Sequence, residues 1–77
     1  MAIMTNYHFN ALTGGVNSLD SVDGNNLLDG DRAYTVVAGV FRVHYLNATS
    51  GAAESSPDVI SPDTNAGTKR WIKCTFG

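Results

Sequence analysis

Apolar and polar residues alternate most regularly in the middle of the chain, between residues 33 and 46. The run from Ala33 to Ala38 is β-branched or aromatic at most positions, which favours a strand. Ala38-Gly39 then predicts a tight reversal, and the alternation resumes from Val40 to Leu46. These two runs therefore predict a β-hairpin.

The alternation also assigns the side chains to two faces, because successive residues of a strand point to opposite sides of a sheet. A further alternating run, residues 69–76, is expected to pair with the hairpin. Arg42 and His44 are expected to point outward. The other face is apolar and is the predicted core face: Val36, Phe41, Val43, Tyr45, Ile72, Cys74 and Phe76.

The rest of the chain carries turn and loop signals. Residues 10–31 are rich in Asn, Gly, Asp and Ser and predict at most one or two short helical turns, with Asn17 or Ser18 as N-cap. Residues 47–68 predict an ordered loop in which Val59-Ile60 pairs briefly at a sheet edge. The predicted fold class is mainly β, as a small antiparallel sheet, a sandwich or a barrel with long ordered loops.

Length sets the domain organisation and points to assembly. We expect 77 residues to form an N-terminal arm, residues 1–10, and a single β-rich domain, residues 11–77. A domain of this size buries only about 60% of the surface that its unfolded chain exposes, so it gains from disulfides, metals or partner subunits. Cys74 is the single cysteine and cannot form a disulfide within the chain. Partner subunits are the remaining source of stability.

The sequence offers no set of residues for catalysis, a cofactor or a metal. The Asp residues between positions 20 and 31 do not have the spacing of a calcium-binding EF-hand loop, and Asp23-Gly24 and Asp29-Gly30 read as turns. Nothing in the sequence brings His8, His44 and Cys74 together. We therefore assign no catalytic, cofactor-binding or metal-ligating residues and expect no enzyme activity.

Charge and hydropathy argue against nucleic acid and membrane as partners. The net charge is −2, and residues 1–31 contain no Lys or Arg. The three basic residues near the C-terminal end are too few for a duplex-binding surface. The N-terminal residues lack the basic and apolar segments of a signal peptide or a membrane anchor.

Several aromatic and proline residues are candidate partner contacts. If Ile72 faces the core, Trp71 lies on the opposite side. It is then exposed beside basic residues, packed against the Pro57–Pro62 loop, or packed against the same loop of a neighbouring subunit. Aromatic residues alternate with polar ones in residues 7–10, so the arm is able to add an edge strand to a neighbour. The predicted partner contacts are Tyr7, Phe9, Pro57, Pro62 and Trp71.

Four segments stand out by their order and spacing: Ala11-Leu12-Thr13-Gly14-Gly15, Leu19-Asp20-Ser21-Val22-Asp23-Gly24, Leu28-Asp29-Gly30-Asp31-Arg32-Ala33, and Ser50 to Ile72. Together they resemble a small β-rich module of tailed-phage and prophage structural proteins, especially tail-fibre-like and appendage polypeptides. The resemblance spans about four-fifths of the chain.

The resemblance implies a non-enzymatic virion structural protein, as a trimeric capsid decoration or cement protein or a small appendage protein. Its implied partners are copies of itself in a homotrimer and phage capsid or tail proteins, and its implied location is the virion, after synthesis in the bacterial host cytoplasm. The alternative is a tail-fibre-type attachment module that contacts the tail or, through Trp71, Tyr34 and Tyr45, a host-surface glycan. A small regulatory protein with a soluble partner is a third class, supported only by size.

Overall fold

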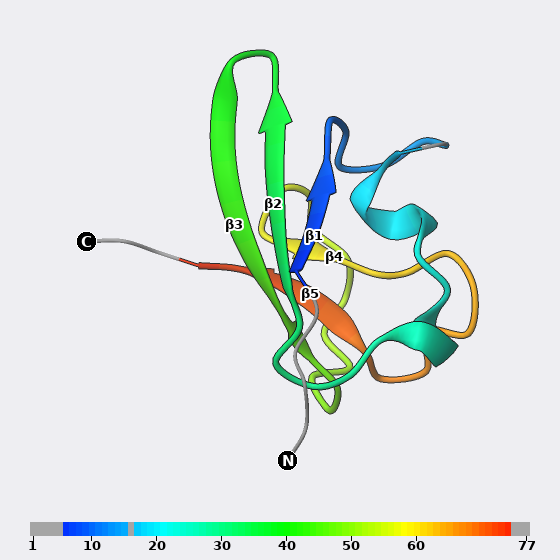
Figure 1. Cartoon of the computed structure of the whole chain (residues 1–77). Helices are drawn as coiled ribbons and strands as arrows, with labels where there is room; N and C mark the ends of the chain where they lie inside the picture. Colours follow the sequence, from blue (N-terminus) through cyan, green and yellow to red (C-terminus); the bar gives the residue numbers. More distant parts are fainter. Residues whose placement is uncertain (1–5, 16, 75–77) are drawn as a thin grey trace.

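The computed structural model describes residues 6–15 and 17–74 of the chain (Figure 1). In chain order the elements are β1 (Asn6–Phe9), two 3-10 turns η1 (Leu19–Ser21) and η2 (Gly24–Asn26), and the strands β2 (Arg32–Val37), β3 (Val40–Asn47), β4 (Val59–Ile60) and β5 (Arg70–Lys73). The five strands form one sheet in the order β1-β2-β3-β5-β4. The predictions of a mainly β fold and of short helical turns are confirmed.

The sheet is mixed and open. β1 runs parallel to β2, whereas the other neighbouring strands are antiparallel. The predicted small antiparallel sheet thus contains one parallel pair at the β1 edge, because residues 10–31 carry the chain back so that β2 starts beside the start of β1. β1 and β4 are the two edges, so the described residues form neither a barrel nor a sandwich.

The predicted hairpin is confirmed in its position and register. Val37 is paired with Val40 across a two-residue turn in which Ala38 and Gly39 have φ values of 51° and 78°. Positive φ at both central positions matches the right-handed twist of the flanking strands. The pairing of the final run with the hairpin is also confirmed, since β5 lies beside β3, and the pair Val59-Ile60 forms the edge strand β4.

Part of the predicted N-terminal arm belongs to the sheet. Residues 6–9 form β1 and pair with β2, whereas residues 1–5 lie outside the described residues. The Tyr7 ring lies 6.0 Å from the Phe9 ring and meets Trp71 edge-on at 5.9 Å. Tyr7 and Phe9 therefore pack against the chain's own core while they stay half-buried on an edge strand, so their role as partner contacts remains a prediction.

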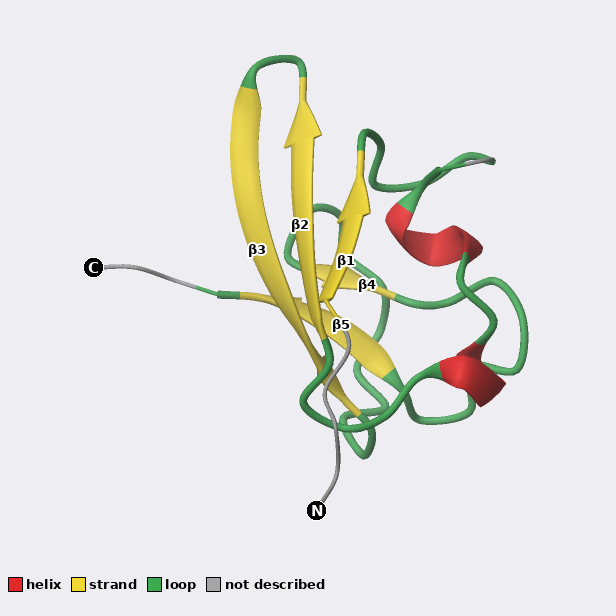
Figure 2. Cartoon of the chain, in the orientation of Figure 1, coloured by secondary structure: helices red, strands yellow, loops and turns green. Residues whose placement is uncertain are grey.

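The core lies between one face of the sheet and the loops that carry the 3-10 turns. Figure 2 shows both turns on the same side of the sheet. The fully buried apolar residues come from the strands and from these loops: Leu19, Leu27, Ala33, Leu46, Ile60 and Trp71. Truncating a buried leucine or tryptophan typically costs about 2–5 kcal/mol, so these few side chains hold most of the packing energy.

The face that sequence alternation predicted as the core is the one that the loops leave uncovered. Val36, Phe41 and Tyr45 are 56%, 61% and 38% exposed. Val43, Ile72 and Cys74 are half-buried, and Phe76 lies outside the described residues. The grouping of the six described residues on one face is correct, but alternation does not determine which face the loops cover. Leu19 and Leu27 pack on the side of Ala33 and Leu46 instead.

Because the loops cover the other face of the sheet, the predictions for the residues on that face change as well. His44 was expected to point outward, yet it is fully buried. Trp71 is fully buried and Pro62 is buried, so their prediction as partner contacts is wrong, while Pro57 is half-buried. Trp71 is the Cα partner of Ile60 and shares the core with it. The alternative interpretation, in which Trp71 packs against the Pro57–Pro62 segment, agrees with this placement.

Candidate functional site

The most prominent surface feature is the uncovered side of the sheet. We call it the open face and define it by residues of β2, β3 and β5: Tyr34, Val36, Phe41, Val43, Tyr45 and Ile72. Cross-strand register aligns these residues in pairs, Tyr34 with Val43 and Val36 with Phe41, and places Tyr45 opposite Ile72. Four of the five large apolar side chains that are exposed in the described chain lie on the β2–β3 hairpin, which projects beyond the other strands in Figure 1.

Aromatic rings form a row across three strands on this face. The His8 ring of β1 stacks on Tyr34 of β2 with a centroid separation of 5.3 Å and an interplanar angle of 28°. Tyr34 in turn stacks on Phe41 of β3 at 6.2 Å and 12°. Stacked rings hold one another in fixed positions, so the row is a preformed apolar surface that loses little side-chain entropy on binding.

The charge on the open face is sparse and positive. None of the five strands contains Asp or Glu. Arg32 is exposed at the start of β2 and is the Cα partner of Tyr45. The Arg70 guanidinium is tied back by hydrogen bonds that it donates to the carbonyl oxygens of Ala52 and Gly67. The face is therefore a hydrophobic patch with a basic rim, which is a composition that contact surfaces have.

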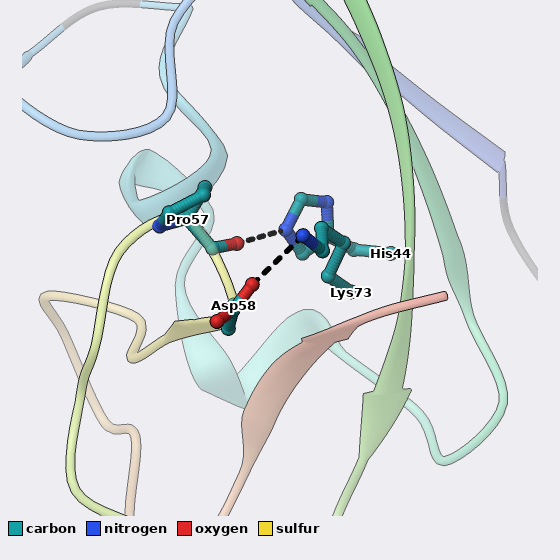
Figure 3. Close-up of polar contacts among 4 residues, drawn as sticks. All are labelled: His44, Pro57, Asp58 and Lys73. Carbon is teal, nitrogen blue, oxygen red and sulfur yellow. Dashed lines mark hydrogen bonds and ion pairs between the residues drawn. The ribbon is translucent and has the colours of Figure 1, made fainter. Parts of the chain in front are cut away.

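A second group of polar residues lies on the packed face, around His44 (Figure 3). The His44 Nε2 atom lies 2.8 Å from the carbonyl oxygen of Pro57. Because a carbonyl only accepts, Nε2 carries the hydrogen and Nδ1 is the unprotonated nitrogen. Nδ1 is buried and has no hydrogen-bond partner among the described residues. This contact attaches the loop between β3 and β4 to the middle of the sheet.

Burial lowers the pKa of His44 below its ordinary value of 6.5. The nearby cations Arg42 and Lys73 lower the pKa further, whereas the hydrogen bond to Pro57 and the charge of Asp58 oppose the shift. A proton on Nδ1 would place a buried N–H and a positive charge where no acceptor is available. Burial and the lack of an acceptor at Nδ1 therefore favour the neutral imidazole in the folded protein.

An ion pair anchors the same loop at the next residue, Asp58. The Lys73 Nζ atom lies 2.9 Å from Asp58 Oδ1, and the Lys73 backbone N–H donates to the Asp58 carbonyl oxygen at 2.9 Å (Figure 3). The Lys73 side chain lowers the pKa of Asp58. Asp58 is mostly exposed, so solvent weakens this pair. The cluster has the character of a structural clasp.

The geometry gives no arrangement for a Cys-His pair. His44 lies on the packed face of β3, while Cys74 follows β5 and donates its backbone N–H to the carbonyl oxygen of Val43. Cys74 shares the open side with Ile72 because it lies two residues further along the chain. The thiol and the imidazole therefore project from opposite sides of the sheet.

The Asp residues of the first half serve local structure. Asp23 is the N-cap of η2, where its side chain accepts the Asn25 backbone N–H, and Asn65 donates to the same carboxylate oxygen at 2.9 Å. These contacts lower the pKa of Asp23. Asp29 accepts the Ala48 backbone N–H at 2.8 Å. Among the described residues no group of three or more His, Cys, Asp or Glu side chains is placed to hold a metal ion.

The sequence grouped most residues of the open face but predicted them as the core, and it did not indicate the residues that extend the face or the role of His44. His8 and Arg32 flank the face because β1 pairs in parallel with β2, which the sequence did not signal.

No helix within residues 6–15 and 17–74 is long and apolar enough to cross a membrane. No family model matches the chain, and neither a curated protein nor a solved structure proved similar to it.

Proposed function

We propose that this protein is a non-enzymatic structural module that assembles with further copies of itself through the open face. The observation that carries the proposal is the exposure of Phe41, Val36 and Tyr45 on the uncovered side of the sheet. A contiguous exposed apolar surface costs free energy in water and marks a contact site. Association covers it without any change in the packed core.

The more specific form of the proposal is a virion structural protein, as a capsid decoration, cement or small appendage protein. It rests on the resemblance of the four sequence segments to phage modules. Assembly through the open face fits such a role, because several linked subunits hold a particle surface more firmly than one weak contact does. The homotrimer implied by the resemblance remains one form of this assembly.

The alternative is an attachment module that binds a glycan on the same face. Tyr34 and Tyr45 lie there and are able to contact a sugar ring, whereas the buried Trp71 does not contribute. The two proposals make different predictions at high protein concentration. Self-assembly covers the tyrosines, whereas a glycan-binding face stays free until sugar is added.

The test compares two serine variants that remove similarly exposed side chains. Phe41→Ser changes the open face, and Leu28→Ser changes a residue that is 54% exposed in the loop before β2. Light scattering over a dilution series gives the mass of each, and co-sedimentation with undecorated phage shells gives particle binding. We expect Phe41→Ser to lose both self-association and shell binding and Leu28→Ser to keep them. A wild-type chain that stays monomeric at every concentration contradicts the proposal.

A further inference from the structure

Arg32 is a basic residue without a partner at the rim of the open face. It is exposed at the start of β2, and its guanidinium forms no ion pair or hydrogen bond with residues 6–15 and 17–74. The basic residues of β5 differ, because Arg70 donates to loop carbonyl oxygens and Lys73 pairs with Asp58. An anion in solution therefore finds the whole guanidinium fork of Arg32 available for binding.

The strands that form the open face contribute no negative charge. All seven Asp and Glu residues of the chain lie outside the five strands. Asp31 precedes Arg32, but it is fully buried, and its carboxylate accepts the Leu28 backbone N–H. The carboxylate of Asp29 accepts the Ala48 backbone N–H. The charge at this end of the face is therefore complementary to an anionic ligand.

Beside Arg32 the face presents aromatic rings that carry polar atoms. Tyr45 is the Cα partner of Arg32 and is 38% exposed, and Tyr34 lies two residues along β2 on the same side. The hydroxyl groups of the two tyrosines and the ring nitrogens of the exposed His8 have no hydrogen-bond partner among the described residues. Hydroxyl groups both donate and accept hydrogen bonds, so a ligand rich in hydroxyl groups supplies partners for all of these atoms.

A charged sugar has the chemistry that this surface recognises. Aromatic rings carry negative charge on their faces, which attracts the positively polarised C–H groups on one side of a pyranose ring. We propose that the open face binds a short oligosaccharide of hexuronic acids, in which one ring packs on Tyr45 while its carboxylate contacts the guanidinium of Arg32. The stacked row of His8, Tyr34 and Phe41 holds the following rings of the sugar chain. This inference rests on the glycan-binding alternative of the proposed function and names the class of sugar.

The spacing of the strands fits a ring that carries its own carboxylate. Residues directly opposite each other in an antiparallel pair have Cβ atoms about 4.5–5.5 Å apart, so the Arg32 and Tyr45 side chains start side by side. In a hexuronic acid the carboxylate is bonded directly to the sugar ring, so its charge and its C–H face are similarly close. A planar carboxylate also matches the parallel N–H groups of one guanidinium. Along β2 the face extends from Arg32 to Val36, about 14 Å, which accommodates a few sugar rings.

The test is a ¹⁵N–¹H NMR titration at a protein concentration where sedimentation shows a monomer. The probe is trigalacturonic acid, and its fully methyl-esterified form is the matched neutral ligand, because esterification removes the charges and keeps the sugar rings. We expect the acid to shift the amides around Arg32, Tyr34 and Tyr45, and the ester to bind about fivefold more weakly, as for the loss of one solvent-exposed ion pair. Added salt should weaken the binding of the acid and leave that of the ester unchanged.

Two arginine variants separate this inference from the proposed function. Arg32→Gln should lose about fivefold in affinity for the acid and keep its affinity for the ester, whereas Arg42→Gln, on the opposite side of β3, should bind both as the wild type does. Equal binding of acid and ester, or equal effects of the two variants, overturns the acidic-sugar site and leaves neutral glycan binding standing. No shift with either sugar overturns the inference together with the glycan-binding alternative. Self-assembly is decided separately by the mass of the Phe41→Ser variant.

Discussion

Two alanine substitutions on opposite faces of β3 provide a sharp test of which side of the sheet is the core. Leu46 is 1% exposed and packs with the loops, whereas Phe41 is 61% exposed on the open face. Truncation of a buried leucine typically lowers the free energy of unfolding by about 2–5 kcal/mol. Because Leu46 is completely buried, we expect Leu46→Ala to lower it by about 3–4 kcal/mol. A fully buried phenylalanine costs about 3–5 kcal/mol, and the two-fifths of Phe41 that is covered reduces this to about 1–2 kcal/mol.

The free energy of unfolding is measured by urea denaturation at low protein concentration, where self-association contributes little. A domain of this size has a total stability of roughly 4–12 kcal/mol, so Leu46→Ala is expected to bring the chain close to unfolding while Phe41→Ala stays clearly folded. The reverse order, with Phe41→Ala the more damaging, would refute the placement of the core. Repeating the measurement at high protein concentration is expected to enlarge the cost of Phe41→Ala alone.

Two further outcomes are expected. Because burial lowers the pKa of His44 below 6.5, the unfolded chain binds a proton before the folded one, and the free energy of unfolding should fall as the pH drops below 6.5. A His44→Phe variant should lose this slope, and an unchanged slope would contradict the buried imidazole. Lys73 lowers the pKa of Asp58 from 3.8, so the contribution of Asp58 is lost at more acidic pH. Gly24→Ala should cost about 2–3 kcal/mol in urea denaturation, because its Cβ would overlap the Asn65 carbonyl oxygen and lie 2.8 Å from the carbonyl carbon. Asn26→Ala, an exposed neighbour, should be nearly neutral, and equal effects at the two positions would argue against the contact between η2 and the Asn65 turn.

The strands and the hairpin were predictable because they depend on local pattern. Alternation and the Ala38-Gly39 turn are short-range signals, and they correctly predicted β2, β3 and the pairing of β5. The edge pair Val59-Ile60 was predictable for the same reason. The parallel strand β1 was not, because its pairing is set by contacts across more than twenty residues of irregular chain.

The identity of the core face could not be read from alternation. Both faces of β3 carry large side chains, with Phe41 and Tyr45 on one and His44 and Leu46 on the other. Which face of β3 becomes the core depends on where Leu19 and Leu27 pack, and these residues lie in segments without strand or helix periodicity. His44 can be buried because its Nε2 atom forms a hydrogen bond with the carbonyl oxygen of Pro57. The residues of the candidate site were thus grouped correctly from the sequence, but their exposure required the tertiary structure.

The central claim is that the open face mediates self-association, and the most direct test is a concentration series of ¹⁵N–¹H NMR spectra. The account predicts that amide shifts of the β2–β3 hairpin, around Tyr34, Val43 and Tyr45, move together with a single association constant as concentration rises. The amides of η1, η2 and the Asn65 turn should stay fixed, because their side of the sheet is already covered. Concentration-dependent shifts confined to those loops, with a silent hairpin, would contradict the claim.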